Sequence, residues 1–130
     1  MRNRKSKYQE KILEAIRGKG IHMSAEEVYR QVCQNEPSVG IATVYRQLNS
    51  LWIQKRIGRI RDKDQGYIYD GNSIPHHHLH CVVCEQYMDI TLPYDKKLDL
   101  EVQQEEEAEI TEHSIIFEGI CKHCKEKRRI

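Results

Sequence analysis

Two Cys-x-x-Cys pairs constrain the fold of this chain more than any other feature of its sequence. The pairs are Cys81/Cys84 and Cys121/Cys124, with 36 residues between them. In a reducing compartment, cysteines paired in this way are typical of metal ligands rather than of disulfides. Thiolates at positions i and i+3 can grip one ion together, and two such turns complete a tetrahedral four-sulfur site, which favours zinc. The pattern predicts that two distant segments meet around one zinc ion.

The role expected of this zinc is structural, because four protein ligands leave no open position on the metal for catalysis. Disulfides or unrelated thiols are the alternatives. The fifth cysteine, Cys33, stands apart in an apolar helical pattern. We interpret it as a small buried hydrophobic residue rather than a reactive thiol.

A histidine run at residues 76–80, His-His-His-Leu-His, is the second candidate metal site. Side chains alternate along a strand, so His76 and His78 would face the same way and share a metal such as Fe(II), Mn(II), Zn(II) or Co(II). Asp70 and Asp89 lie nearby in the sequence, and a mixed nitrogen and oxygen shell suits Fe(II) or Mn(II). The alternative is a histidine-rich surface patch with no ligand role.

The net charge of +1 hides an asymmetry between the two halves of the chain. Residues 1–74 hold 14 Lys and Arg against 8 Asp and Glu, whereas residues 75–130 hold 7 against 12. A basic half joined to an acidic half predicts that only the first half contacts an anionic partner. The alternative is that like charges cluster by chance on solvated faces.

The length and composition of the chain limit the number of its domains and the size of its core. A chain of 130 residues suffices for one ordinary domain or two small ones. With 38% hydrophobic and 32% charged residues, we expect a thin core that a metal or a partner subunit would support. No apolar run approaches the ~18 residues of a membrane helix, and no apolar segment follows the basic N-terminus as in a secretory signal. The expected location is the cytoplasm.

Three short helices are predicted in the first half, over residues 5–17, from Ser24 onward, and over residues 41–54. Ser24 and Glu27 have the spacing of a capping box. The third helix is expected to turn four residues inward: Val44, Leu48, Leu51 and Trp52.

Two strand-like pieces follow these helices, at residues 57–60 and 67–69, with a polar turn between them. Helices followed by such a hairpin predict a winged helix-turn-helix unit, and the basic charge favours DNA binding. A small structural helix bundle is the alternative. In the second half, strands are expected around residues 76–83, 86–92 and 113–120, a helix within 94–109, and a solvated basic end at 122–129.

Four segments of the chain resemble the ferric uptake regulator family. Residues 38–48 contain Ala-Thr-Val-Tyr-Arg with a Leu two residues on, as in the family's recognition helix. Residues 22–29 are similar to its second helix with a leading histidine, residues 76–84 to its hinge and first cysteine pair, and residues 119–124 to its second pair. The motifs occur in the family's order and at about its spacings.

The resemblance implies an α+β chain, with an N-terminal winged helix-turn-helix domain at residues 1–73 and a C-terminal α/β dimerisation domain at 74–130. It implies a homodimer that binds a double-stranded DNA operator as a repressor. It also implies a structural Zn(2+) on the four paired cysteines and a regulatory Fe(2+) or Mn(2+). Matched residue by residue, the regulatory ligands are His22, Asp70, His76, His78 and Asp89.

The same resemblance points to DNA contacts from the recognition segment. Tyr45 and Arg46 are expected to contact bases, since Tyr can pack on a thymine methyl and Arg can pair with guanine or phosphate; the alternative is an exposed helix face with no DNA contact. Ser38 and Thr43 are expected either to bond phosphate or to cap and pack. The family's usual Thr-Pro-Gln-Arg opening of the first helix is absent, so phosphate contacts there are lost or fall to Arg2, Arg4 and Lys5.

Within the family, the chain resembles the peroxide-responsive branch most, because Asp89 replaces the Glu of many iron regulators. Asp70 also differs from the cysteine that zinc uptake regulators tend to use. In the peroxide branch Fe(II) reacts with hydrogen peroxide and a ligand histidine is oxidised, here matching His22 and His76. A further metal site of some members would use His77 and His113, but it needs a Glu where this chain has Lys96, so we do not expect it here.

Three alternatives remain open at the level of the sequence. The first is an iron-responsive repressor of iron uptake genes without peroxide chemistry. The second is a metal storage or transfer protein, against which the helix-turn-helix pattern argues. The third is an enzyme with a mononuclear iron, but five protein ligands would leave little open coordination, so we expect no enzymatic activity.

Overall fold

The computed structural model describes residues 4–18 and 20–128, with side chains from residue 7 onward. The proposed phosphate contacts of Arg2, Arg4 and Lys5 therefore lie outside the described residues and side chains. The chain forms two compact units, Met1–Ile74 and Pro75–Ile130.

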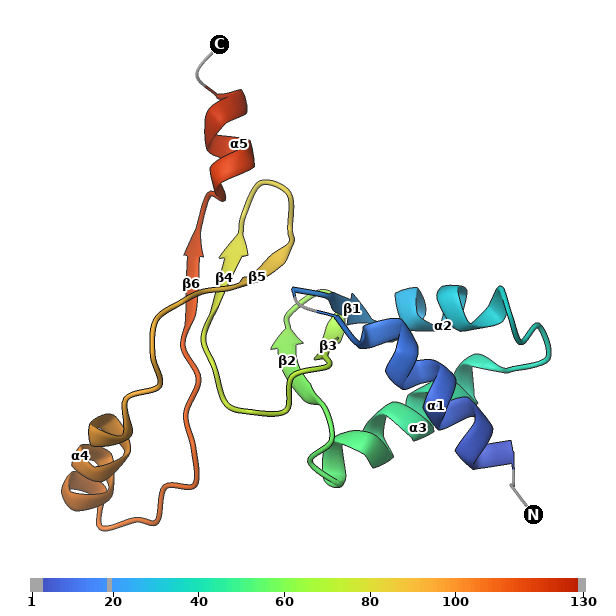
Figure 1. Ribbon diagram of the computed structural model, residues 1–130. Coiled ribbons are helices and arrows are strands. Elements are labelled where there is room, and N and C mark those ends of the chain that lie inside the picture. Colours follow the sequence, from blue (N-terminus) through green and yellow to red (C-terminus); the bar gives the residue numbers. More distant parts are fainter. Residues whose placement is uncertain (1–3, 19, 129–130) are drawn as a thin grey trace. The chain divides into compact units, whose positions relative to one another are not determined.

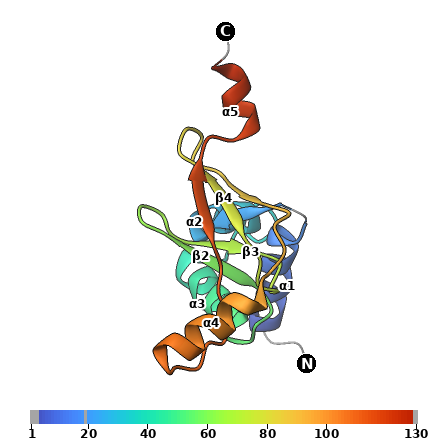
Figure 2. The same cartoon turned by 90° about the vertical axis from the view of Figure 1, so that its left-hand side faces the viewer.

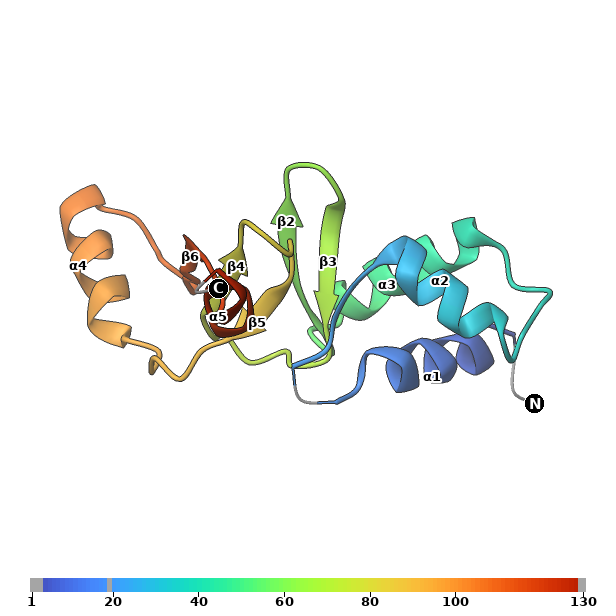
Figure 3. The same cartoon turned by 90° about the horizontal axis from the view of Figure 1, so that it is seen from above.

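The first unit consists of three helices and a three-stranded sheet (Figure 1). The sheet is antiparallel in the order β1-β3-β2, and the β2–β3 hairpin projects beyond the helices (Figure 3). In chain order the elements are α1 (Arg4–Ile16), β1 (His22–Ser24), α2 (Ala25–Cys33), α3 (Ile41–Ile53), β2 (Gly58–Asp62) and β3 (Gly66–Asp70). The strand β1 was not expected from the sequence, because three residues are too few to show a period.

Local signals explain where these elements begin and turn. The Ser24 side chain accepts a hydrogen bond from the backbone N–H of Glu27 at 3.2 Å, and the Glu27 carboxylate accepts from the N–H of Ser24 at 3.1 Å. This is the predicted capping box, and it starts α2. In the hairpin, Asp62 Oδ1 accepts from the N–H groups of Asp64 and Gln65, and Gly66 follows with a φ of 77°, which glycine adopts without strain.

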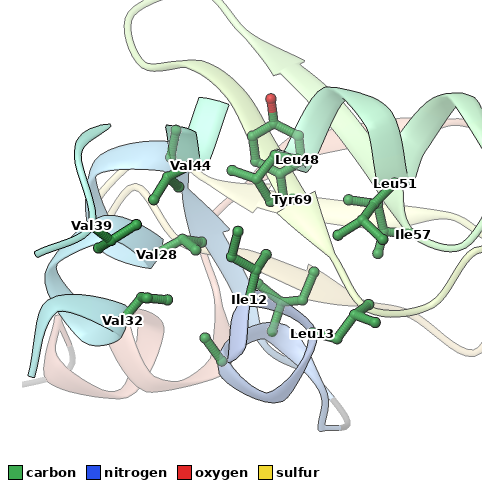
Figure 4. Packing of buried hydrophobic residues seen from close by; sticks show 13 residues of the cluster. Ile12, Leu13, Val28, Val32, Val39, Val44, Leu48, Leu51, Ile57 and Tyr69 are labelled. Carbon is green, nitrogen blue, oxygen red and sulfur yellow. The ribbon is translucent and has the colours of Figure 1, made fainter. Parts of the chain in front are cut away.

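One face of each helix forms the core of the first unit (Figure 4). Ile12 of α1, Val28 of α2 and Leu48 of α3 are fully buried. Each such side chain stabilises the fold by roughly 1.5–3 kcal/mol through the water it displaces. The prediction for Trp52 was wrong: it is 40% exposed. Cys33 packs against the core and is only partly buried.

The second unit has a three-stranded sheet with a helix near each end (Figures 1 and 2). The order is β5-β4-β6, with β4 antiparallel to β5 and parallel to β6. Its elements are β4 (His78–Cys81), β5 (Tyr87–Asp89), α4 (Lys96–Glu106), β6 (Ile116–Gly119) and α5 (Lys122–Lys127). The basic end at 122–129, which we expected to be solvated, contains the short helix α5, and its described residues other than Cys124 are exposed.

The predicted α+β class is confirmed by these elements. The second unit buries little apolar surface of its own. Among its described residues, the buried hydrophobic ones are Cys81, Tyr87, Cys121 and Cys124. Of the helices in the described part of the chain, none has the length and apolar character needed to cross a membrane.

Candidate functional site

The four paired cysteines meet in the second unit. Their sulfur atoms lie within 4.8 Å of one another, and Cys84 Sγ is 3.9 Å from Cys121 Sγ. Pairing of β4 with β6 brings this about, because Cys81 is the partner of Gly119, two residues before Cys121. No disulfide joins the described cysteines. A tetrahedral cluster of four thiolates is the donor set that zinc prefers, so these residues fit a zinc ion.

The backbone around Cys81 prepares one of these thiols for a cation. The N–H of Cys121 donates to Cys81 Sγ at 3.3 Å and the N–H of Cys84 at 3.5 Å. These bonds lower the pKa of Cys81 to about 6, so the thiolate forms at neutral pH. Burial raises the pKa of Cys124 to about 12, so its ionisation needs a positive partner. A divalent metal bound to the four sulfur atoms would neutralise the negative charge of the thiolates.

The first unit holds two of the predicted regulatory ligands, His22 and Asp70. They are partners in the β1–β3 register, and His22 Nε2 lies 3.2 Å from Asp70 Oδ2. His22 Nδ1 donates to the carbonyl of Gly20 at 3.1 Å, so a neutral ring turns the lone pair of Nε2 toward the carboxylate. Two lone pairs facing each other require either a proton or a cation between them.

The second unit holds the other three predicted ligands, His76, His78 and Asp89. Asp89 Oδ1 lies 3.0 Å from His76 Nε2 and 3.3 Å from His78 Nε2. The ring centroids of the two histidines are 4.3 Å apart. Both imidazoles thus point at one carboxylate oxygen, and this donor set fits a divalent metal of borderline softness. The strand β4 starts only at His78, yet both rings face Asp89.

A second group of polar residues in the second unit joins His77 and His113, named above for the family's further metal site, to Tyr94 and Asp99, which the sequence analysis did not single out. His113 Nδ1 lies 2.6 Å from Asp99 Oδ1, and the Tyr94 hydroxyl donates to Asp99 Oδ2. The rings of Tyr94 and His113 stack with centroids 4.3 Å apart, and His77, 1% exposed, stacks on His113 at 5.3 Å. Hydrogen bonds from Tyr94 first, and then from His113, lower the pKa of Asp99. These bonds attach α4 to the segment that precedes β6.

The remaining histidine of the run, His80, is bonded within the second unit. Its Nδ1 lies 2.8 Å from Glu118 Oε2 and its Nε2 lies 3.4 Å from Glu85 Oε2. The ring also stacks on Tyr87 with centroids 4.5 Å apart. His80 thus contacts two carboxylates of its own unit, and among the described residues it belongs to neither candidate group of metal ligands.

Three of the four residues predicted to contact DNA lie on α3 or at its start. Tyr45 and Arg46 are exposed on α3, and Thr43 is partly buried beside them. The Arg46 guanidinium donates to Thr43 Oγ1 at 3.1 Å, which fixes part of this surface. Ser38 is exposed on the turn that precedes α3 and is not its N-cap, because Gly40 holds that position without a side-chain bond.

A stacked arginine joins the hairpin to α3. The Arg59 guanidinium lies 3.4 Å from the ring centroid of Trp52 and 3.8 Å from that of Tyr67, and it donates to Asn49 at 3.3 Å. Sequence reasoning missed this contact because it placed Trp52 in the core. Arg61, on the same strand, adds a second guanidinium 5.5 Å from Tyr67. Basic and aromatic side chains alternating on one surface are typical of nucleic-acid interfaces.

The comparisons with known proteins agree with this architecture. A ferric uptake regulation protein from Bacillus subtilis is 34% identical over 110 residues, covering 82% of this chain and 74% of that protein. A peroxide-responsive repressor from Staphylococcus aureus is 28% identical over 109 residues, covering 82% and 72%. The structure of the ferric uptake regulator of Helicobacter pylori, reported to reveal three functional metal binding sites, covers 96% of this chain and 83% of that one, with 25% identity and a TM-score of 0.74.

Residues 2–118 also match the sequence model of the ferric uptake regulator family. That match spans both units and includes the α3 segment, the histidine run and the first cysteine pair. Members of this family are transcription regulators. The chain belongs to the ferric uptake regulator family.

Proposed function

We propose that this protein is a metal-dependent DNA-binding repressor whose regulatory metal, Fe(2+) or Mn(2+), is held jointly by both units. The observation that carries the proposal is the pair of ligand groups on either side of the junction. His22 and Asp70 form the group in the first unit. His76, His78 and Asp89 form the group in the second unit, and His76 follows Asp70 by only six residues. Each group alone has too few ligands to complete the coordination of a metal ion. Both groups offer nitrogen and oxygen donors, which suit Fe(2+) or Mn(2+).

Joint ligation explains how metal binding would control DNA binding. With all five ligands on one ion, the two units would be held at one angle. In a dimer, the two α3 helices would then reach successive major grooves at fixed spacing. Without the ion, docking would have to order the junction at an entropic cost, and affinity would fall. Tyr45 and Arg46 would contact bases, while Ser38 and Thr43 would contact phosphates.

The proposed dimer rests on the second unit. Its described surface exposes several large apolar side chains, which an isolated small unit does not need. Those with at least two fifths of their surface exposed include Leu92, Leu100, Val102 and Phe117. A second copy of the chain would cover them, as is common for homodimers. We propose the structural Zn(2+) for Cys81, Cys84, Cys121 and Cys124. A DNA partner and reduced cysteines would place the protein in the cytoplasm.

Titrations with DNA test the core of this proposal. The parent should bind an operator duplex with Mn(2+) and release it with a chelator. His76→Ala should lose the metal-dependent binding and remain dimeric. His123→Ala, which removes an exposed histidine of α5, is the matched control and should behave as the parent. Metal-dependent binding that survives in His76→Ala would refute the joint site.

The finer proposal is that the protein senses hydrogen peroxide. Asp89, the ligand typical of that branch, supports it. Fe(II) in the site would reduce peroxide and generate the oxidant that adds oxygen to a histidine. His22 and His76 are the expected targets, because they are the positions that match the oxidised histidines of the peroxide branch. Peptide mass spectrometry on anaerobic Fe(II)-loaded protein should show one added oxygen after peroxide, and a Mn(II)-loaded sample should show none.

A second candidate is an iron-responsive repressor of iron uptake genes. The 34% identity to the Bacillus subtilis ferric uptake regulation protein favours it. The same mass spectrometry separates the two candidates. Unmodified His22 and His76, in a protein that still needs Fe(II) to bind DNA, would establish the iron-responsive function.

A further inference from the structure

A carboxylate on α2 is bonded to an expected DNA contact on α3. The Tyr45 hydroxyl donates to Glu26 Oε1 at 2.5 Å, across 19 residues of sequence. Both helices belong to the first unit, so the contact lies within one compact body (Figure 1). Glu26 stands in the first turn of α2, next to Glu27. Because Glu27 closes the capping box, Glu26 is not needed to start the helix.

The charge states of the pair support a persistent hydrogen bond. The bond from Tyr45 is the main reason that the pKa of Glu26 lies below its ordinary value. The same bond is the main reason that the pKa of Tyr45 is raised. Near neutral pH the donor is therefore a phenol and the acceptor a carboxylate, which is the stronger, charge-assisted form of such a bond.

The bond decides which part of Tyr45 remains available. The side chain is 43% exposed, but its hydroxyl is already engaged. A tyrosine has two side-chain torsions, and a bond at its far end restricts both. The exposed ring is thus presented in one orientation, with its apolar edge rather than its hydroxyl free to contact a ligand. A negatively charged neighbour also disfavours a phosphate at the hydroxyl.

We infer that Glu26 is a positioning residue for operator recognition, which holds Tyr45 so that the ring meets the base edges in the major groove. This inference rests on the proposed function. An apolar ring edge in that groove discriminates thymine by its methyl group. Glu26 therefore contributes to sequence preference through Tyr45, although its own charge opposes the DNA backbone and lowers affinity for every duplex.

The test measures a ratio of affinities. The Mn(2+)-loaded parent first selects a duplex from a random-sequence library. The dissociation constant is then measured for that duplex and for a scrambled duplex of the same length and composition. Glu26→Ala should lower the ratio of specific to scrambled binding by roughly 2- to 10-fold, as expected when one side chain must be ordered on binding. Glu26→Gln, whose amide oxygen still accepts from Tyr45, should keep most of the ratio.

A double-mutant cycle separates positioning from simple removal of charge. Tyr45→Phe should lower the ratio about as much as Glu26→Ala, and the double variant should lower it no further. Glu14→Gln removes the same charge from an exposed side chain of α1 that pairs with Lys11. It should strengthen binding to both duplexes alike and leave the ratio unchanged.

Two results would overturn the inference. One is a Glu26→Ala variant that behaves like Glu14→Gln, with stronger binding to both duplexes at an unchanged ratio. The other is additive loss in the double variant. A parent protein that enriches no duplex at all would instead refute the proposed function, and this inference with it.

Discussion

His22 and Asp70 face each other across the β1–β3 pair, with His22 Nε2 3.2 Å from Asp70 Oδ2 and side chains only 2% and 4% exposed. Because Nδ1 of the ring donates to Gly20, this contact without a cation requires a proton between Nε2 and the carboxylate. A buried carboxylate and a buried ring nitrogen that face each other are donors for one cation, so the pair fits a metal ion.

Asp70→Asn should therefore separate metal affinity from stability. The amide oxygen can still accept from the Asn72 N–H, which bonds Asp70 Oδ1 at 2.9 Å, and the amide N–H can donate to His22. We expect Mn(2+) affinity to fall at least ~10-fold, as loss of a ligand or its orienting partner does. The metal-free variant should be at least as stable as the parent in urea. A markedly less stable metal-free variant would show that His22 is protonated and paired with Asp70.

Cys84→Ala should unfold the second unit. Three of the four buried hydrophobic residues described there are themselves cysteines of the cluster, so little apolar burial remains to replace the metal. Structural zinc contributes roughly 10–16 kcal/mol of apparent binding energy at neutral pH. The variant should lose its zinc, measured by elemental analysis, and its dimer, measured by sedimentation. Cys33→Ala removes a cysteine outside the cluster and should keep both; a zinc-free Cys84→Ala dimer would contradict the expectation.

Arg59→Ala should disturb the hairpin and be visible in fluorescence, because Trp52 is the only tryptophan. The guanidinium stacks on that ring at 3.4 Å. Its removal should shift the emission to longer wavelength and cost about 0.5–2 kcal/mol of unfolding free energy in the first unit. For Arg59→Lys, the emission wavelength and the unfolding free energy should lie between those of the parent and those of Arg59→Ala, because an ammonium cannot stack as a planar guanidinium does. An unchanged spectrum in Arg59→Ala would mean that the stack does not persist in solution.

The second unit should lose stability in mild acid through His77. Burial, and then the neighbouring His113, lowers the pKa of His77, and its Nδ1 must stay unprotonated to accept from the Ile115 N–H at 3.0 Å. A lowered pKa in a base means that the unfolded chain binds more protons. Stability is therefore fully present above the ordinary pKa of about 6.5 and declines as pH falls below it.

Urea denaturation of zinc-loaded protein between pH 7.5 and 5.5 checks this expectation. His77→Gln should show a flatter decline than the parent, whereas His123→Gln, which changes an exposed histidine, should follow the parent. Equal slopes in His77→Gln and the parent would assign the decline to other groups, such as the cysteine thiolates.

Local sequence patterns predicted the elements of the first unit well. The capping box of Ser24 and Glu27, the apolar spacing of Val28 and Leu48, and the polar turn before Gly66 act over a few residues. Such signals do not depend on distant contacts, so they can be recognised in the sequence alone. The same approach failed at Trp52, because helical period alone does not tell a core face from a face covered by Arg59.

The candidate metal ligands could likewise be predicted from the sequence, because they are residue types at fixed spacings. The two Cys-x-x-Cys pairs and the histidine run named the candidate donors before any fold was known. Which donors meet within each unit depended on strand register: β4 pairs with β6 to join the cysteines, and β1 pairs with β3 to join His22 to Asp70. The bond from Tyr45 to Glu26 and the bond from His113 to Asp99 had no signal in the sequence, although the family resemblance had put His77 and His113 in one site. These two bonds join residues 19 and 14 positions apart, and only the packing of whole elements brings such side chains within hydrogen-bonding distance.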